Sequence, residues 1–206
     1  LFVMQIGNFH LMILVLSILA MTALEQNQLL RGGSLLAFTI LSKISPGILG
    51  IVLLCQRRFR SVLFVAGAGG LLLALTLLCF GIHPLQFFIS YALPHLSSGA
   101  AFPPMTTFDG IRTNTSLFGF PFKLQSLGLQ IGDPWELGRM MGRLYTVCVV
   151  LLAAASSLRK QGDRRDQAIR WMSLLVLSAL QSPFAPAYVW FGLFWATILL
   201  SVEVRS

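Results

Sequence analysis

Lys43 is the residue whose type and surroundings most clearly indicate chemistry. It stands inside an apolar stretch, residues 34–55, shortly before Pro46. A cation at membrane depth costs about 2.5–3.5 kcal/mol on insertion scales, so such residues are rare and mark functional sites by default. An ammonium group can hold a phosphate or a carboxylate as a point charge. The alternative is a lysine whose charged end snorkels to the membrane surface.

A second group of polar residues lies further along the chain, at Asp109, Arg112 and Asn114, with Ser116 close behind. Arginine suits phosphate, whereas carboxylate and amide groups suit sugar hydroxyls. The group therefore predicts an anion or sugar site. A solvated polar loop would explain the same residues equally well.

A third candidate follows the two prolines of residues 182–186, where Tyr188 begins a new apolar run. Prolines break a helix there, and the freed helix ends can bind polar ligands. The alternative is a tight turn in which Tyr188 serves as an interfacial anchor.

Metal and cofactor chemistry have no support in the residue spacing. Three histidines and three cysteines are scattered without ligand spacing, at His10, His83, His95, Cys55, Cys79 and Cys148. Metal sites need such side chains at short, defined intervals. We therefore predict no metal and no cofactor. The histidines are interpreted as interfacial and the cysteines as inert.

The composition decides which elements position these candidates. The chain has 206 residues, of which 56% are hydrophobic and only 11% are charged. A soluble domain carries about 45–50% apolar and about 25% charged residues. So few charges cannot cover a surface in water. The sequence predicts an all-α fold, a polytopic transmembrane bundle with short broken helices and one long extracytoplasmic loop.

The apolar runs predict where the helices lie within a single transmembrane domain, residues 1–206. Prolines divide the final stretch into two short helices. A less apolar segment, residues 84–139, forms the predicted loop, with interfacial helices at 85–93 and 117–129. Gly67, Gly69 and Gly70 predict a close helix approach. The predicted membrane helices are residues 9–24, 34–55, 61–82, 140–158, 169–180 and 188–202.

The net charge of +8 concerns topology and does not indicate a nucleic-acid partner. Basic residues gather in the segments 56–60 and 159–170, which fall on one side, and cytoplasmic loops retain such residues. Residues 84–139 then lie outside the cytoplasm. Residues 34–55 form either one proline-kinked helix or a broken hairpin. The hairpin places Arg31 on the basic side and Lys43 near the outer face.

The order of these features resembles glycosyltransferase family 87, whose members depend on polyprenyl-phosphate mannose and have the GT-C architecture. The resemblance covers most of the chain. It rests on Gly7-Asn8, Arg31-Gly32, Ser42-Lys43-Ile44-Ser45-Pro46, Arg57-Arg58-Phe59-Arg60, Asn114-Thr115-Ser116-Leu117 and Ser182-Pro183-Phe184-Ala185-Pro186-Ala187-Tyr188.

The resemblance implies a bacterial inner-membrane enzyme that moves a hexose, typically mannose, from a polyprenyl phosphate to an extracytoplasmic lipid or glycan acceptor with inversion. It implies that Lys43 binds the donor phosphate, while Asn114 and Ser116 line the sugar site. The family's catalytic acid lies in a first outer loop, which we expect upstream of Leu1, in a longer protein of which this chain is an inactive C-terminal part. Asp109 is not a substitute for it. A membrane transporter or flippase is the alternative function.

Overall fold

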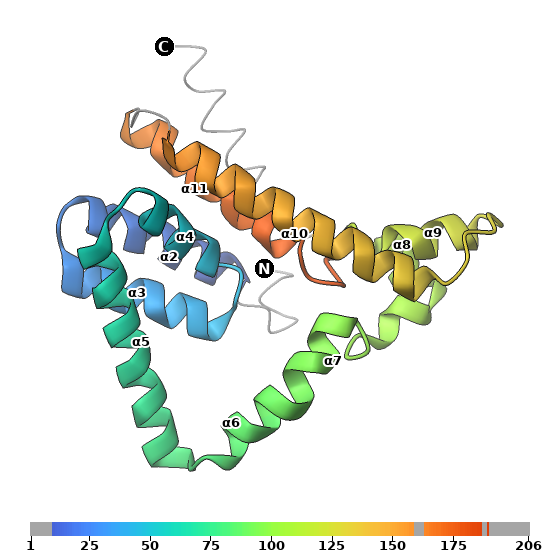
Figure 1. The fold of residues 1–206 in the computed structure, drawn as a ribbon, viewed down its shortest axis with the longest axis horizontal. Helices are drawn as coiled ribbons and strands as arrows, with labels where there is room; N and C mark the ends of the chain where they lie inside the picture. The colour runs from blue at the N-terminus through green and yellow to red at the C-terminus, as the bar shows by residue number, and fades with distance from the viewer. Residues whose placement is uncertain (1–9, 159–162, 187–188, 190–206) are drawn as a thin grey trace. The chain divides into compact units, whose positions relative to one another are not determined.

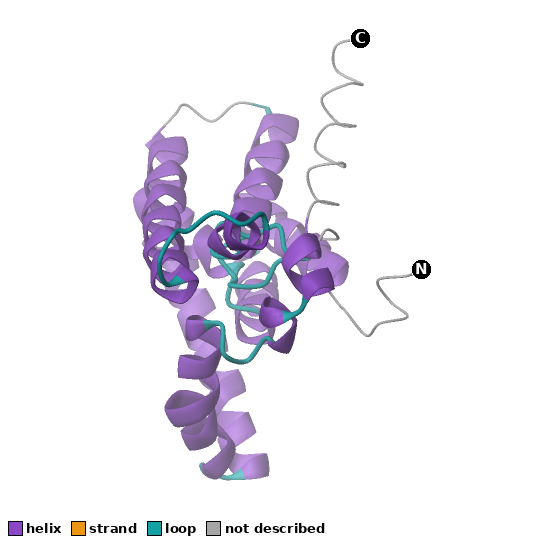
Figure 2. Ribbon diagram, turned by 90° about the vertical axis from the view of Figure 1, so that its right-hand side faces the viewer, coloured by secondary structure: helices purple, strands orange, loops and turns teal. Residues whose placement is uncertain are grey.

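A computed structural model describes residues 10–158, 163–186 and 189 of the chain. In this part of the chain Figure 2 contains helices and connecting loops but no strand, which confirms the all-α prediction. The described residues divide into two compact units. Unit 1 takes in the described parts of Leu1–Leu75, Val149–Ser178 and Trp190–Ser206, and unit 2 those of Thr76–Cys148 and Ala179–Val189.

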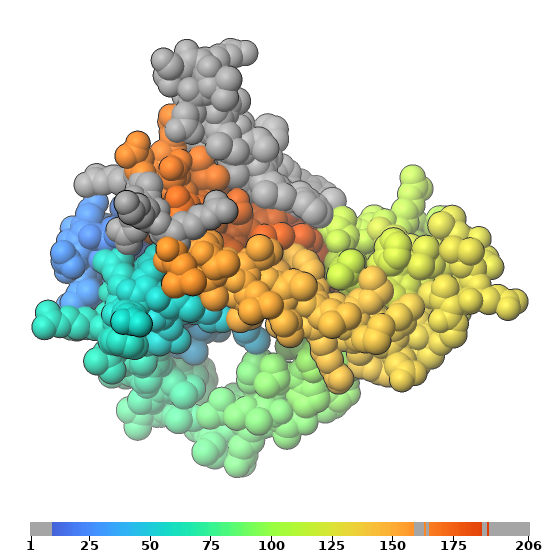
Figure 3. All heavy atoms as spheres, turned by 45° about the horizontal axis from the view of Figure 1, so that its top comes forward, coloured from blue at the N-terminus to red at the C-terminus, as the bar shows by residue number. Residues whose placement is uncertain are grey.

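Two of the described helices are long and apolar enough to cross a membrane, α5 (Phe59–Phe80) and α10 (Pro134–Leu158). A span needs about 20 apolar residues. In α5 only Ser61 is buried, and Leu78 is 82% exposed. The side chains of α10 likewise stand on the surface over much of its length (Figure 3). Such continuous apolar surface is typical of contact with lipid. The other predicted membrane crossings stay predictions.

Unit 1 begins with the antiparallel helices α2 (His10–Glu25) and α3 (Leu29–Ser42), joined by a three-residue turn (Figure 1). Gly32 allows their close packing, because a Cβ atom there would lie 2.7 Å from Leu24 Cγ and 2.8 Å from the Ala20 carbonyl oxygen. On the other side of α3, a Cβ at Gly33 would press on Phe64 of α5. These two glycines hold α3 close to both neighbours.

Residues 34–55 form a broken hairpin, not one helix. The helix α3 ends at Ser42 and α4 (Gly47–Cys55) begins after Pro46, with the chain reversing between them (Figure 1). Proline lacks the N–H that a continuing helix needs and disfavours helical geometry in the residue before it. At about 21 Å and 14 Å these helices are each too short to cross about 30 Å of hydrocarbon. The turn that carries Lys43 is therefore made by local sequence.

The two basic segments lie at the same end of unit 1. Arg58 forms an ion pair with Glu25 at the end of α2, and its guanidinium also donates to the Leu24 carbonyl oxygen at 2.8 Å. The helix α11 (Arg164–Ala179) brings Gln167 and Arg170 to a cavity that Gln56 also lines. The two segments therefore share one side, as the charge pattern predicts.

Unit 2 contains the whole of the predicted long loop, residues 84–139, and this segment is largely helical. Its helices are α6 (His83–Phe87), the π-helix η1 (Phe88–Ala92), α7 (Leu93–Ser98), the 3-10 helix η2 (Pro103–Thr106), α8 (Phe108–Thr113) and α9 (Phe120–Ser126). The segment ends earlier than the apolar pattern suggests, because α10 begins at Pro134 and not near Met140.

The core of unit 2 is aromatic. Met105, Phe118 and Phe122 are buried, and Trp135 packs against them. The Phe122 and Trp135 rings meet edge to face with centroids 4.9 Å apart. Phe102, Ile111 and Phe184 extend the same cluster. The cluster joins the start of α10 to the loop helices, and it gives unit 2 a hydrophobic core of its own.

The last predicted helix, residues 188–202, lies outside the described residues except for Val189. The helix before it, predicted at 169–180, is α11 and begins earlier, at Arg164. Its first turn is polar, so an apolar-run criterion starts the helix too late.

Candidate functional site

Lys43 occupies the turn between α3 and α4 in unit 1. Its backbone is extended, and its N–H donates to the Thr39 carbonyl oxygen at 2.9 Å, which closes α3. Gly47 N–H donates to the Ile44 carbonyl oxygen at 2.9 Å, which closes the turn. The Ser178 hydroxyl of α11 donates to the Ser45 carbonyl oxygen at 2.8 Å. The turn is therefore fixed from both sides.

The Lys43 side chain meets His10, the first residue of α2. The Nζ of Lys43 lies 2.7 Å from Nδ1 of His10, and the histidine is only 8% exposed. An ammonium group has donors only, so the imidazole accepts at Nδ1 and carries its hydrogen on Nε2. The pair then has one positive charge. Lys43 remains half-buried, so a ligand can still reach its other N–H groups.

His10 is the neighbour of Lys43 that the sequence analysis missed. The interpretation as a scattered interfacial histidine is incomplete, because His10 is buried and bonded to the leading candidate. A signal was present. The hairpin topology places Lys43 at the same end as the start of the first apolar run, where His10 stands.

Asn114 lies in unit 2, is 1% exposed and is fully engaged with protein groups. Its Nδ2 donates to the Pro183 carbonyl oxygen at 2.9 Å. Its Oδ1 accepts from the backbone N–H of Ser116 at 3.0 Å and of Ala185 at 2.9 Å. Gly119 makes room, because a Cβ there would lie 2.3 Å from the Asn114 amide nitrogen. Asn114 thus links two segments that are far apart in the sequence.

Thr115 and Ser116 complete this link. The Ser116 hydroxyl donates to the Pro183 carbonyl oxygen at 2.7 Å, and the Thr115 hydroxyl donates to the Ala185 carbonyl oxygen at 2.6 Å. The Thr115 N–H donates to the same Ala185 oxygen at 2.7 Å. We call the five residues Asn114, Thr115, Ser116, Pro183 and Ala185 the clamp. The clamp holds the proline-rich break against the end of α8.

The other predicted site residues are placed differently. Asp109 and Arg112 lie on α8 with exposed side chains, and within the described residues neither side chain has a hydrogen bond or ion pair. Asn114 is thus buried and hydrogen-bonded to the protein, whereas these two charged side chains are exposed to solvent. Tyr188 lies outside the described residues. The substrate-binding roles of Asp109, Arg112, Asn114, Ser116 and Tyr188 stay predictions.

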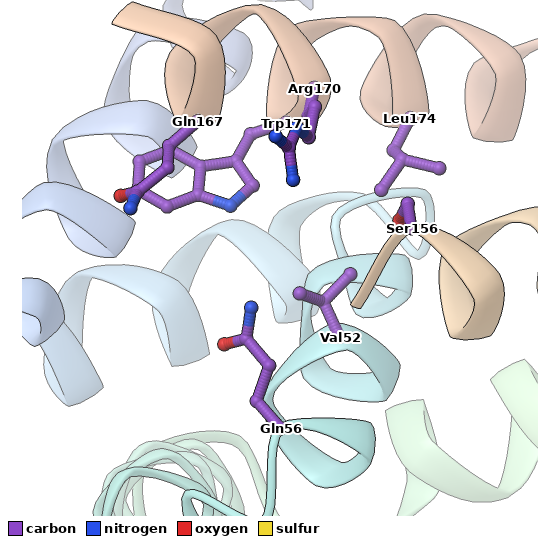
Figure 4. A pocket seen from close by; sticks show the side chains of 7 residues that line it. All are labelled: Val52, Gln56, Ser156, Gln167, Arg170, Trp171 and Leu174. Carbon is purple, nitrogen blue, oxygen red and sulfur yellow. The ribbon is translucent and has the colours of Figure 1, made fainter. Parts of the chain in front are cut away.

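A small cavity lies at the basic end of unit 1. It has a volume of about 20 Å³. Figure 4 shows Gln167, Arg170 and Trp171 of α11 facing Gln56, which directly follows α4. A cavity of this size holds a water molecule but not a sugar phosphate. A neighbouring pocket shares Gln167 and Trp171 with this cavity and reaches Glu25 at the end of α2 opposite His10. Neither is lined by Lys43 or His10, so neither is part of the Lys43 site.

Comparisons with known proteins identify the family but no individual relative. The chain matches glycosyltransferase family 87 over residues 2–200. No curated protein and no solved structure matches it. Among the described residues, no group of three or more histidine, cysteine or acidic side chains could hold a metal ion.

Proposed function

The chain belongs to glycosyltransferase family 87, and we propose that it transfers a hexose, mannose by the resemblance, from a polyprenyl phosphate to an extracytoplasmic lipid or glycan acceptor. That it is a glycosyltransferase and a membrane protein follows from the family, and the two long apolar helices agree with the latter. The observation that supports our donor assignment is the Lys43 ammonium, held by a neutral histidine in a helix break. The transporter or flippase alternative has no support from the family match.

In the proposed reaction, negative charge builds up on the phosphate as it leaves the sugar. The acceptor hydroxyl attacks the anomeric carbon from the face opposite the phosphate, so that carbon gains a bond to the acceptor oxygen and loses its bond to the phosphate oxygen. The polyprenyl phosphate departs with the bonding electrons, and a base takes the hydroxyl proton. A fixed cation beside the departing phosphate stabilises this transition state, most strongly where water is excluded.

The placement of charges in unit 1 supports a donor site on the outer side. The helix α2 is about 24 Å long, with the ion pair of Arg58 and Glu25 at one end and Lys43 with His10 at the other. Basic segments stay in the cytoplasm. The Lys43 turn then points away from the cytoplasm, toward the outer leaflet of a bacterial inner membrane, where a lipid-linked sugar has its phosphate at the interface.

We propose that unit 2 binds polar groups of the acceptor. Its loop helices carry the exposed polar pair Asp109 and Arg112, whose chemistry suits hydroxyl and phosphate groups. We propose an extracytoplasmic position for residues 84–139, a GT-C architecture and a multi-pass topology. The proposed role of Asn114 and Ser116 is indirect, since their hydrogen bonds shape the loop that carries this pair.

Replacing Lys43 by alanine tests the donor assignment in the full-length membrane protein. We expect Lys43→Ala to lower transfer from polyprenyl-phosphate mannose by about a hundredfold or more, as loss of a transition-state cation contact does. Arg31→Ala is the matched control, because Arg31 is an exposed cation near the start of α3, the helix that ends just before Lys43, at the basic end of the unit. Wild-type turnover by correctly inserted Lys43→Ala protein would refute the assignment.

A further inference from the structure

We propose that His10 is a positioning residue for the donor phosphate: its Nδ1 accepts a hydrogen bond from Lys43 and holds the ammonium group in the place where the phosphate binds. The inference deepens the proposed function and rests on it. It concerns a histidine that neither the residue spacing nor the family resemblance singled out.

The first step is that both members of the pair are anchored by contacts other than the one between them. His10 begins α2, whose axis is held against α3 by the close approach at Gly32. Lys43 follows α3 in a turn that Pro46 and the Ser178 hydroxyl hold in place. The 2.7 Å contact between Nζ and Nδ1 therefore joins two anchored points. A free lysine has four rotatable side-chain bonds, and one fixed hydrogen bond removes most of that freedom.

The second step is that the pair retains its charge. Glu25 neutralises Arg58 at the other end of α2, but the neutral imidazole of His10 accepts from Lys43 without adding a negative charge. Three N–H donors belong to an ammonium group, and His10 takes one of them. Two remain for the oxygens of a phosphate. A carboxylate in the place of His10 would orient Lys43 equally well and would repel the phosphate.

Three substitutions at position 10 separate orientation from charge. His10→Leu removes the acceptor and keeps an apolar side chain. His10→Asn restores an acceptor close to the position of Nδ1. His10→Asp is isosteric with asparagine and keeps the acceptor, but it replaces the amide N–H groups by an oxygen and adds a negative charge. The readouts are the KM for polyprenyl-phosphate mannose, the KM for the acceptor, and the binding of radiolabelled farnesyl phosphate, which carries the phosphate but no sugar.

We expect His10→Leu to weaken farnesyl phosphate binding and to raise the donor KM by roughly tenfold to a hundredfold, the loss typical of a hydrogen bond to a charged group. The acceptor KM should not change. His10→Asn should stay within about threefold of wild type, and His10→Asp should be at least as weak as the leucine variant, because its charge opposes the phosphate. A merely structural role would lower the active fraction, and so kcat, without moving the donor KM.

Two results would overturn the inference: wild-type donor binding by His10→Leu, or equal losses in the asparagine and leucine variants. Neither result would refute the proposed function, provided that Lys43→Ala still abolishes transfer. Conversely, full activity of Lys43→Ala would refute the donor assignment itself, whatever the variants at position 10 do.

Discussion

Replacing Asn114 by alanine tests whether this side chain is a structural link or a sugar ligand, because the two roles predict different losses. Alanine removes the Oδ1 atom that accepts from the N–H groups of Ser116 and Ala185. Each buried group left without a partner costs about 1–3 kcal/mol. The Pro183 carbonyl oxygen keeps its bond from the Ser116 hydroxyl at 2.7 Å, so it adds little.

The expected loss of unfolding free energy for Asn114→Ala is therefore about 2–6 kcal/mol, from two orphaned N–H groups. This is a large part of the roughly 5–15 kcal/mol that stabilises a typical domain. Ser116→Ala is the matched control. It should cost only about 1 kcal/mol, since the Pro183 oxygen still accepts from Asn114 and the Gly119 N–H still reaches the Ser116 carbonyl oxygen at 3.2 Å.

The assay is an unfolding titration of the full-length protein in mixed micelles, followed by tryptophan fluorescence. Trp135 lies in the core of unit 2, so its signal reports the region that the clamp holds. Asn114→Asp adds a second check, because it keeps the acceptor but places an oxygen opposite the Pro183 carbonyl. A change of less than about 0.5 kcal/mol in Asn114→Ala would refute the structural role. If the acceptor KM rose in that stable variant, Asn114 would be a ligand.

Two further predictions concern unit 1. Gly32→Ala should destabilise the protein by about 1–3 kcal/mol, because its Cβ atom would press on the Ala20 backbone. Thermal unfolding measures this loss, and Gly50→Ala is the control because a Cβ at Gly50 is not crowded. Equal unfolding midpoints for the two variants would contradict the close packing at Gly32. The second test labels single cysteines with a membrane-impermeant thiol reagent in a background without the native cysteines. The reagent should label Ser45→Cys from outside the cell and the exposed Gln26→Cys only from the cytoplasm. Labelling of both variants from one side would contradict the proposed orientation.

Helix positions that depend on local sequence could be predicted closely. The run 61–82 is α5, Phe59–Phe80, and the run 9–24 is α2, His10–Glu25. Apolar length alone determines such segments. The break in 34–55 also has a local cause in Pro46, and the unfavourable depth of Lys43 indicated it. These features need no knowledge of distant contacts.

The start of α10 was predicted too late although a local signal was present. The Asp133 Oδ1 atom accepts from the Trp135 N–H at 3.0 Å, and Pro134 occupies the first turn. An acidic cap followed by proline is a helix-start signal. The apolar-run criterion overlooked it because Glu136 and Arg139 interrupt the hydrophobic pattern. Trp135 anchors the start of α10, because it packs into the aromatic core.

The tertiary pairings could not be predicted as contacts, although the hairpin topology already placed His10 and Lys43 at the same end of the first helices. His10 and Lys43 are 33 positions apart, and the Asn114 side chain meets the Pro183 oxygen 69 positions away. Glycines show the same limit. Gly67, Gly69 and Gly70 were expected to admit a neighbouring helix, yet among the described residues a Cβ at Gly67 or Gly70 would meet nothing within 4 Å, and one at Gly69 would make only an ordinary 3.9 Å contact with Ala37. The close approaches of these helices occur at Gly32 and Gly33 instead. A small residue permits close packing, but only the arrangement of the helices decides where it occurs.

Because this chain has so few charged residues, each charge that lies in or near the membrane needs a physical explanation. A cation in or near a membrane must be compensated, and Arg58 is compensated by Glu25. Lys43 is different, because among the described residues its side-chain partner is the neutral His10. Retaining an ammonium group there is costly unless an anion binds to it. The proposed lipid-linked phosphate would supply that anion from within the bilayer, and its binding would offset the cost of keeping the charge in place.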